Sequence, residues 1–456
     1  MGAVEQLSLP GAPSIRVPPP GPKSAELLKA QERLETQSRT YTKQFSMAIK
    51  RAKGSVIEDM DGNLYIDWFS GICVLNLGHA NPLVKRAMVD QIDKLVHMNE
   101  VPSEARVRFM ETLESTLPGS LRNSAKFMFT VTGGDACEAA VALARHVSKK
   151  RTIVVFGGAY HGVAGDIVGA TANYHYREYA ALSSAGFHHL PYPYTYRFPT
   201  KTSKEEMARA VVDQLEYSIR DPYSGVGGVG GVLVEPIQGE GGYIVPPDDF
   251  LPMLREVTEK YSIPLIVDEI QSGMGRTGRI WASELVGISP DIMCMSKSIG
   301  GGIPTSVVAY RKDYDKDLPA GFHLGTFRGN PVALAAGEAI LRHFKESSLL
   351  ERVRVEGERI KSRFQEISTR FDQIGEVRGR GFMIGTELVN SRETRAPGTE
   401  LARKVKEGMF SRGVLMHTCG HFSNVLRFMA PLTIEDSLVD KGLEIYETSM
   451  EKAVRG

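Results

Sequence analysis

An acidic pair at residues 268–269 and a lysine, Lys297, are placed where they could do chemistry together. The pair directly follows the apolar, β-branched run 265–267, which predicts a buried parallel strand. Lys297 comes just after a second short apolar run, residues 292–295. Because ligands bind at the carboxyl ends of the strands in open α/β sheets, we expect a carboxylate and an amine in one crevice.

Such a pair supports one specific kind of chemistry. A lysine with an unprotonated amine forms a Schiff base with a carbonyl compound, and burial or nearby cations favour that state by lowering the pKa of the amine. A carboxylate such as Asp268 can keep a pyridinium nitrogen protonated, which makes the ring an electron sink. Both roles together are the arrangement that binds pyridoxal 5′-phosphate. The alternative is that residues 268–269 cap a helix and that Lys297 is solvated.

Three segments, VDEIQSGMGRTGR, PDIMCMSKSIGGGIP and HLGTFRGNP, resemble the class III aminotransferases among the fold-type I pyridoxal-phosphate enzymes. The resemblance extends from about Gly54 to the C-terminus, and the spacing of Asp268 and Lys297 agrees with it. It implies an α/β fold: a large domain with a mostly parallel seven-stranded sheet between helices, and a smaller α+β domain made from the N- and C-terminal segments. The expected ranges are 1–70 (N-terminal arm and part of the small domain), 71–345 (large cofactor-binding domain) and 346–456 (C-terminal small domain).

The phosphate of the cofactor is expected at a glycine turn. A predicted strand at 125–131 breaks at Gly133 and Gly134 and runs into an alanine-rich helix at 136–149. Free backbone N–H groups and the helix dipole at such a join favour an anion, and glycine lets it approach closely. The resemblance assigns the phosphate to these two glycines. It also implies that Thr326 reaches the phosphate of the neighbouring subunit's cofactor, which predicts a homodimer with composite active sites and leaves a higher oligomer open.

The remaining cofactor contacts follow from the same resemblance. The ring of Tyr160 is expected to stack on the pyridine ring, and Gln271 to lie near the 3-oxygen of that ring. Asp268 is expected at the ring nitrogen. Lys297 is expected to form the Schiff base and then to act as general base and acid.

Three further residues are expected to bind the substrate. Arg427 lies within an apolar run, where a buried guanidinium needs an anionic partner. The resemblance assigns it to the α-carboxylate and Glu240 to an ion pair with it, while a structural ion pair is the alternative for Arg427. Ile72 is a candidate pocket wall or an ordinary core residue. Where family members specific for 4-aminobutyrate usually carry an arginine, this chain has Val163, which offers a carboxylate no charge.

These features predict an aminotransferase that moves the amino group of an ω-amino or diamino acid, such as 4-aminobutyrate or 2,4-diaminobutyrate, to a 2-oxo acid. The expected acceptor is 2-oxoglutarate. The main alternative is an amino-acid racemase or epimerase of the same family, which the apolar Val163 would suit. A scaffold without catalysis is disfavoured by the intact Lys297 and Asp268. A nicotinamide enzyme is disfavoured because the GxGxxG pattern at 225–230 precedes a strand instead of following one.

Composition limits the other possibilities. The 456 residues are 42% hydrophobic and 24% charged with a formal net charge of +1, which gives no electrostatic argument for nucleic acid or a membrane surface. The four cysteines have no CxxC spacing and no histidine cluster, so neither disulfides nor a metal site is expected. The first residues lack a basic-then-apolar signal pattern, and no run approaches a membrane span. A cytoplasmic enzyme is therefore expected.

Local patterns predict the parts that surround the site. Residues 1–25 are rich in proline and glycine and should form an extended arm, either disordered or lying across a partner subunit. Residues 54–67 should form a hairpin with its turn at 61–63. The glycine-rich stretch 69–79 is expected to be a loop or a short strand. Residues 374–387 should form two strands joined by a tight turn.

Overall fold

A computed structural model describes residues 7–180, 186–198 and 202–455 of the chain. The chain forms two compact units. One, the large unit, comprises residues 83–354; the other, the small unit, combines the chain up to residue 82 with the chain from residue 355 on. The small domain made from both ends of the sequence is thereby confirmed, while the three domain ranges expected from the sequence stay a prediction.

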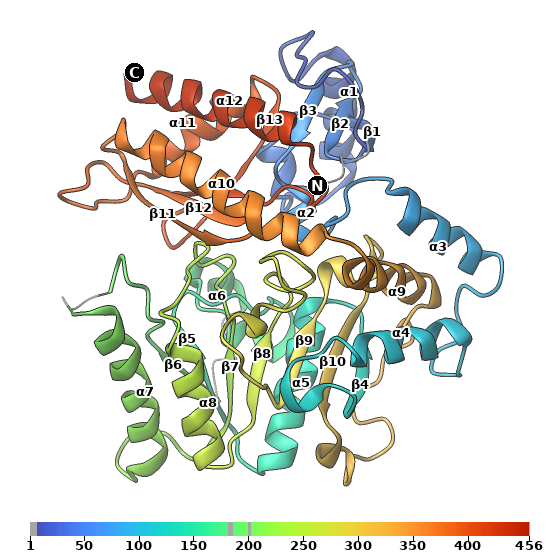
Figure 1. The fold of residues 1–456 in the computed structure, drawn as a ribbon, viewed down its shortest axis with the longest axis vertical. Coiled ribbons are helices and arrows are strands. Elements are labelled where there is room, and N and C mark those ends of the chain that lie inside the picture. Colours follow the sequence, from blue (N-terminus) through green and yellow to red (C-terminus); the bar gives the residue numbers. More distant parts are fainter. Residues whose placement is uncertain (1–6, 181–185, 199–201, 456) are drawn as a thin grey trace. The chain divides into compact units, whose positions relative to one another are not determined.

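The large unit is built on a seven-stranded sheet with the order β4-β10-β9-β8-β7-β5-β6 (Figure 1). β10 runs antiparallel to β4 and β9, and the other neighbours pair in parallel, so the predicted mostly parallel sheet is confirmed. The strands are β4 (Ala125–Thr130), β5 (Thr152–Phe156), β6 (Phe187–Leu190), β7 (Val229–Val234), β8 (Leu265–Asp268), β9 (Ile292–Met295) and β10 (Ser306–Arg311).

Alternation along the buried strands explains why helices cover both faces of this sheet. In β5, Ile153 and Val155 pack with α5 (Gly133–Ser148), whereas Val154 and Phe156 face the opposite way. On that opposite face they meet α7 (Lys204–Arg220) and α8 (Phe250–Lys260) (Figure 1). Successive side chains of a strand point to opposite faces, so continuous apolar strands require cover on both sides.

Capping residues determine where α5 and α7 of the large unit begin. Thr132 caps α5, since its hydroxyl accepts a hydrogen bond from the backbone N–H of Asp135 at 3.2 Å. The helix therefore begins at Gly133, three residues earlier than the alanine run predicts. Ser203 and Glu206 form a capping box that starts α7. The other helices of this part are α3 (Pro82–Ile92), α4 (Glu104–Glu114), α6 (Tyr174–Ala180) and α9 (Pro331–Glu346); short 3-10 turns are 119–121, 165–169, 282–285, 297–300 and 312–315.

The small unit contains two four-stranded sheets, β1-β2-β3-β13 and β11-β12-β15-β14. β2 with β3 and β11 with β12 are antiparallel pairs, which confirms both predicted hairpins. The strands are β1 (Ile49–Lys53), β2 (Val56–Asp59), β3 (Leu64–Asp67), β11 (Ile374–Arg380), β12 (Met383–Leu388), β13 (Val414–Leu415), β14 (His417–Cys419) and β15 (Val425–Phe428). The helices are α1 (Pro22–Leu34), α2 (Ser70–Cys73), α10 (Leu349–Thr369, across the boundary), α11 (Thr399–Phe410) and α12 (Asp436–Arg455), with a 3-10 turn at 41–43.

The described part of the N-terminal arm is fixed to its own unit. Ser14 pairs with Leu64 of β3, and the side-chain oxygen of Asn63 accepts from the N–H groups of Arg16 and Val17 at 2.7 and 3.0 Å. The hydroxyl of Ser8 donates to Glu435 at 2.7 Å. Residues 7–21 are thus an ordered extended segment, and the part of the prediction that falls on residues 1–6 lies outside the described residues.

Within the stretch 69–79, expected as a loop or a short strand, residues 74–79 are a loop with one isolated bridge between His79 and Gly54. Residues 70–73 form a left-handed turn, α2, which the sequence did not predict. Ser70, Gly71, Ile72 and Cys73 have φ of 45°, 61°, 59° and 60°. L-residues avoid this region, so the surroundings must hold it. The Asp67 carboxylate accepts from the backbone N–H groups at 69 and 70, both at 2.8 Å, and the Ser70 hydroxyl donates to the carbonyl at 429 at 2.6 Å. The glycine pattern of this stretch could not predict these hydrogen bonds, because their partners lie elsewhere in the sequence.

Across residues 7–180, 186–198 and 202–455, no helix has the length and apolar character that crossing a bilayer requires.

Candidate active site

A cavity of about 290 Å³ opens in the large unit where β4, β5, β7, β8 and β9 end. Its walls come from the segments that follow these five strands, so it lies at the edge of the sheet where a ligand was expected. The lining residues are Thr132, Gly133, Gly134, Tyr160, His161, Gly162, Val163, Ala164, Glu235, Glu240, Asp268, Ile270, Gln271, Ser296 and Lys297. Seven of the ten predicted site residues are among them: Gly133, Gly134, Tyr160, Glu240, Asp268, Gln271 and Lys297.

Two glycine-containing turns approach each other closely on one side of the cavity. A methyl group added to Gly162 would lie 2.6 Å from Cα of Gly134, and Gly162 has a φ of +124°. Both facts require glycine at 162. The start of α5 stays open on its cavity side as a result, and its first N–H groups have no partner within the helix. This is the geometry of an anion site at a helix N-terminus.

Asp268 is held by three donors. Oδ2 accepts from Nδ1 of His161 at 2.7 Å and from Sγ of Cys137 at 3.4 Å, while Oδ1 accepts from the N–H of Ile270 at 3.0 Å. The carboxylate is only 4% exposed, and His161 and Cys137 are buried as well. Hydrogen bonds to the ionised form stabilise a buried carboxylate. These three hydrogen bonds fix the orientation of the Asp268 carboxylate at the bottom of the cavity.

A second buried carboxyl group lies nearby. Glu235 accepts from the N–H of Tyr160 at 3.0 Å and from the N–H of Gly239 at 2.8 Å, which ties two cavity walls together. Burial raises the pKa of Glu235, and the charge of Asp268 raises it further. Gln271 donates towards Glu240, with 3.5 Å between Nε2 and Oε1. Asp268 and Glu235 are thus two buried carboxyl groups at the same site, and different donors hold them.

The neighbour of Asp268 has a different task. Glu269 accepts from the N–H groups of Ala282 and Ser283 at 3.0 and 2.7 Å and from the hydroxyl of Ser272 at 2.8 Å. Its carboxylate closes the loop that follows β8 and does not line the cavity. The expected acidic pair therefore separates into one residue at the cavity and one that fixes the loop.

Lys297 has an unusual backbone conformation. Its φ is +51°, directly after Ser296, whose hydroxyl donates to the carbonyl of Thr305 at 3.2 Å. A positive φ is uncommon for a residue other than glycine, and such residues concentrate at functional sites. The turn after β9 thus holds the lysine in a sparsely populated conformation beside the cavity.

Cys137, His161 and Asp268 bring one potential metal ligand each within 4.8 Å of one another. Ligands bonded to one metal ion at about 2.0–2.3 Å would stay more than about 3 Å apart. The 2.7 Å between His161 and Asp268 is instead a direct hydrogen bond. These three residues therefore form a hydrogen-bonded cluster.

Three predicted site residues lie elsewhere. Thr326 is exposed and is not among the residues that line the cavity; its carbonyl accepts from the Asn99 side chain at 3.4 Å. Ile72 and Arg427 belong to the small unit. Arg427 is fully buried in β15, with Nη2 at 3.2 Å from Nδ1 of His417. The roles given to these residues stay predictions.

Sequence reasoning missed His161, Cys137 and Glu235 as parts of the site. A signal existed for His161, because it directly follows Tyr160, and for Glu235, because it ends an apolar strand. Cys137 had a weaker one: it lies four positions after Gly133, on the helix face that packs on the sheet. Their meeting at Asp268 joins positions far apart in the chain, which local patterns do not encode.

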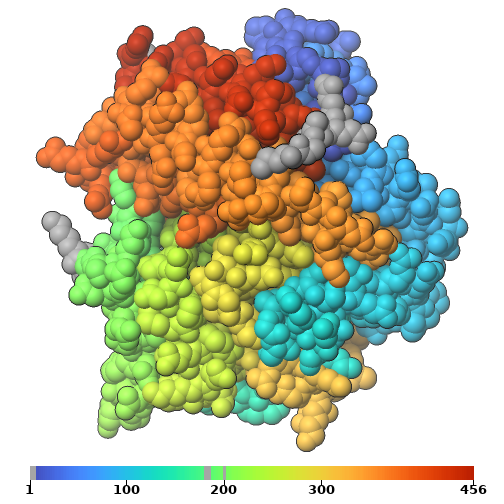
Figure 2. Space-filling model, viewed as in Figure 1, coloured from blue at the N-terminus to red at the C-terminus, as the bar shows by residue number. Residues whose placement is uncertain are grey.

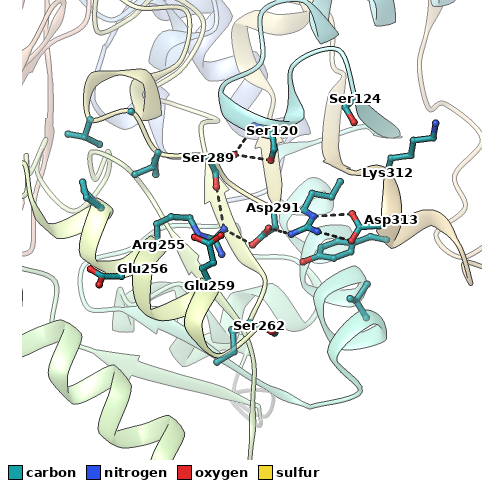
Figure 3. A pocket seen from close by; sticks show the side chains of 18 residues that line it. Ser120, Ser124, Arg255, Glu256, Glu259, Ser262, Ser289, Asp291, Lys312 and Asp313 are labelled. Atoms are coloured by element: carbon teal, nitrogen blue, oxygen red, sulfur yellow. Dashed lines mark hydrogen bonds and ion pairs between the residues drawn. The ribbon is translucent and has the colours of Figure 1, made fainter.

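A larger cavity, about 1380 Å³, lies at the opposite, amino ends of β8 and β9 (Figure 3). Asp291 lies between two arginines there, with 2.7 Å to Arg255 and 3.1 Å to Arg311, and it also accepts from the N–H of Leu265 at 2.9 Å. Ser120 and Ser289 form a hydrogen bond at 2.9 Å beside them. The contacts of Asp291 join the amino ends of β8 and β9 to α8 and to the end of β10.

An amine, a buried carboxylate and an anion-binding helix start around one cavity define the class of pyridoxal-phosphate-dependent enzymes. The sequence matches the family described as "Aminotransferase class-III" over residues 36–450, and the chain belongs to this family. It is a pyridoxal-phosphate-dependent transaminase.

Individual relatives agree with this assignment. The chain is 38% identical over 427 residues to a diaminobutyrate–2-oxoglutarate aminotransferase of Rhizobium meliloti (strain 1021), covering 92% of this chain and 91% of the relative. It is 34% identical to an alanine/serine racemase of Pyrococcus horikoshii, covering 97% and 94%. Among solved structures, an (S)-enantioselective ω-transaminase of Thermomicrobium roseum superposes with a TM-score of 0.86 at 27% identity, covering 94% of this chain and 99% of that one.

The residues of the cavity fit pyridoxal 5′-phosphate. The volume of about 290 Å³ is close to the lower end of small-molecule sites, about 300 Å³. The open start of α5 suits a phosphate, Lys297 offers the amine, and Asp268 offers a buried charge for a ring nitrogen. The buried Oε1 of Gln271, at the same cavity, has no hydrogen-bond partner among the described residues.

Proposed function

We propose that this transaminase takes the ω-amino group of a diamino or ω-amino acid, of the 2,4-diaminobutyrate or 4-aminobutyrate type, and transfers it to 2-oxoglutarate. The observation that carries the proposal is the shared cavity of Lys297, Asp268 and the glycine turn. The substrate class is supported by the relatives, several of which are named diaminobutyrate or 5-aminovalerate aminotransferases. Val163 at the cavity offers no charge to the distal carboxylate, which both donors carry at the same distance from the ω-amino group. The preference for 2,4-diaminobutyrate therefore rests on the relatives named for that substrate.

The roles proposed for the residues of the cavity are those implied by the resemblance to the family, and their shared position at one cavity supports them. When bound, pyridoxal 5′-phosphate supplies an aldehyde for the amine and a ring that withdraws electrons. The N–H groups of Gly133 and Gly134 bind the phosphate, and Asp268 keeps a proton on the ring nitrogen. Lys297 takes the proton from the donor carbon that carries the amine and returns one later. Tyr160 covers the ring, and Gln271 hydrogen-bonds the ring oxygen.

The acceptor requires a carboxylate site as well. We assign the α-carboxylate of the 2-oxo acid to Arg427, whose planar guanidinium binds carboxylates bidentately. Glu240 is assigned as the residue that pairs with this arginine when no carboxylate is bound, and Ile72 as an apolar wall. These three assignments rest on the resemblance to the family.

The working enzyme is proposed to be a cytoplasmic homodimer in which Thr326 contributes to the partner's phosphate site. Leu324 and Phe327 beside it are 72% and 69% exposed, and further exposed apolar side chains occur in residues 83–107, in the blue-to-cyan part of Figure 2. Exposed apolar clusters are typical of surfaces that bind another protein. The cysteines at 73, 137, 294 and 419 are all buried and outside any disulfide, which suits a reducing compartment.

The test is a panel of donors. Purified, cofactor-loaded enzyme is incubated with 2,4-diaminobutyrate, 4-aminobutyrate, 5-aminovalerate, alanine and serine, each with and without 2-oxoglutarate. We expect glutamate to form fastest with 2,4-diaminobutyrate and only when the oxo acid is present. The Lys297→Ala variant, shown to be folded by circular dichroism, should lose at least about 100-fold in rate because proton transfer is lost.

The racemase remains the alternative outcome of that panel. An apolar side chain at Val163 and the Pyrococcus horikoshii relative favour it. Loss of optical purity of alanine or serine without any oxo acid, and no glutamate from any donor, would contradict the proposed function.

A further inference from the structure

Cys137 is one of two side-chain donors at Asp268, with His161, to which no role has been assigned so far. Its thiol lies 3.4 Å from Oδ2 of Asp268, the same oxygen that accepts from His161 at 2.7 Å. Cys137 is fully buried, and it points from α5 towards the end of β8. An S–H group in this place is a hydrogen-bond donor aimed at the buried Asp268 carboxylate.

The surrounding groups explain why an extra donor matters. Glu235 adds a second carboxyl group whose charge and that of Asp268 disfavour each other. Cys294 on β9 is the register partner of Asp268, but its thiol donates to the carbonyl of Ala136 at 3.7 Å. Like charges and burial both favour the neutral form of a carboxyl group, whereas donors favour the ionised form. The cavity also contains Lys297.

The thiol is a permanent donor in this environment. Burial raises the pKa of Cys137 well above its ordinary value, and a hydrogen bond with the Cys294 thiol and the charge of Asp268 add to the effect. A buried thiol keeps its proton and can only donate it in a hydrogen bond. It cannot compete with Asp268 for negative charge.

We propose that Cys137 is a positioning residue of the transamination site, which keeps Asp268 ionised and oriented towards the cofactor ring by donating its S–H to Oδ2. The inference rests on the proposed role of Asp268 at the ring nitrogen. The residue acts through Asp268 and touches neither substrate nor cofactor in this scheme.

The experiment uses holoenzyme loaded with cofactor that is ¹⁵N-labelled in the ring. The ring-nitrogen resonance is followed with pH, and the dissociation constant of the cofactor is measured separately. In Cys137→Ala we expect the resonance to move towards its unprotonated position and the dissociation constant to rise about 2- to 10-fold, the range of one hydrogen bond. Cys137→Ser keeps a donor and should stay close to the wild type.

Cys294→Ala is the matched control. It removes an equally buried thiol from the same neighbourhood but no donor of Asp268. Equal effects of Cys137→Ala and Cys294→Ala on the resonance would overturn the proposal, because the thiol would then be mere packing. Should the alanine variant fail to fold, Cys137→Val fills the volume without a donor and must give the same shift.

A further variant separates this inference from the proposed function. Asp268→Asn should abolish the protonated ring-nitrogen signal. If it does and Cys137→Ala does not move the signal, only the role of Cys137 fails. If Asp268→Asn leaves the signal unchanged, the role of Asp268 itself is wrong, and the inference about Cys137 falls with it.

Discussion

At the scale of single residues, Val163 is the side chain with the clearest consequence for specificity. It is about half exposed at the cavity, at the position where the family members specific for 4-aminobutyrate usually carry arginine. Asp268 and Glu235 make this environment acidic on one side. A carboxylate on the donor would therefore find an apolar contact where it needs a cation.

Introducing that cation should change the preferred donor. In Val163→Arg we expect kcat/KM for 4-aminobutyrate to rise about 5- to 10-fold relative to 2,4-diaminobutyrate. The guanidinium attracts the carboxylate of both donors, but it repels the additional 2-ammonium group of 2,4-diaminobutyrate, and solvent partly screens both effects at this exposure. Initial rates with both donors at fixed 2-oxoglutarate give the ratio. Val163→Gln, which adds length without charge, is the control, and an unchanged ratio in the arginine variant would contradict this view of specificity.

Residue patterns predicted the residues that line the cavity better than the residues that hydrogen-bond to Asp268. Asp268, Lys297 and the two glycines could be found because each follows an apolar run that had to be a buried strand. The support of Asp268 could not, since Cys137 and His161 come from different parts of the chain and only the fold brings them to one oxygen. Pairing across such distances depends on strand order, which no local pattern contains.

At the scale of elements, the two turns that meet at Gly134 and Gly162 determine the shape of the phosphate site. A side chain at 162 would press against the first turn of α5 and would also require a positive φ. The turn at 162 would have to change its conformation, because the start of α5 cannot move without losing its cap at Thr132.

Gly162→Ala should therefore weaken cofactor binding at least about tenfold and lower the melting temperature of the holoenzyme. Gly157→Ala is the matched control, five residues earlier in the same segment, because a methyl group there would meet nothing closer than 3.8 Å. Cofactor titration and calorimetry on both variants provide the measurement. Similar losses in the two variants would show that the close approach at 162 is unimportant.

The bounds of the helices and strands show which elements could be predicted from local sequence patterns. The strands predicted at 125–131, 265–267 and 292–295 agree with β4, β8 and β9 to within one residue, because apolar runs act within a few residues. The left-handed turn α2 could not be predicted in this way, since its conformation depends on Asp67 and on a carbonyl more than 300 positions away. The helix α12 was not expected at all, although its apolar face is buried in the small unit.

At the scale of the whole molecule, assembly is the first property to test. Phe327→Asp should shift the proposed dimer towards monomer, because a charge would replace an exposed apolar side chain at the proposed interface. Sedimentation velocity over a range of concentrations measures the effect. Tyr223→Asp, at an aromatic residue that is 93% exposed elsewhere on the large unit, is the control. A monomeric wild type would contradict the proposal directly.

Stability should also depend on pH through the buried carboxyl groups. Burial raises the pKa of Glu235 and of Glu269 in the folded protein, so the folded state binds more protons than the unfolded state between the ordinary and the raised pKa values. Their stabilising contribution is complete below the ordinary pKa and is lost as pH rises through the raised value.

Glu235→Gln should flatten this decline for the cofactor-free enzyme, measured as the free energy of unfolding in urea from pH 5 to 8. Glu256→Gln, at an exposed glutamate of the cavity in Figure 3, should leave the profile unchanged. If the free energy of unfolding of Glu235→Gln declined with pH as steeply as that of the wild type, Glu235 would not be the cause of the decline.

The sheet order has a consequence for how the enzyme is made. β4, the first strand of the sheet in the sequence, pairs with β10, the last one. On the ribosome, the segment from residue 130 to residue 306 takes roughly 10–35 s to synthesise at about 5–20 residues per second. During that interval the strand that leads into the glycine turn has no neighbour, and Lys297 is completed only near its end. Capture of the cofactor is therefore a late event in the life of the nascent chain, and a pause in translation after β9 would prolong a stage in which β4 is exposed to pairing with other chains.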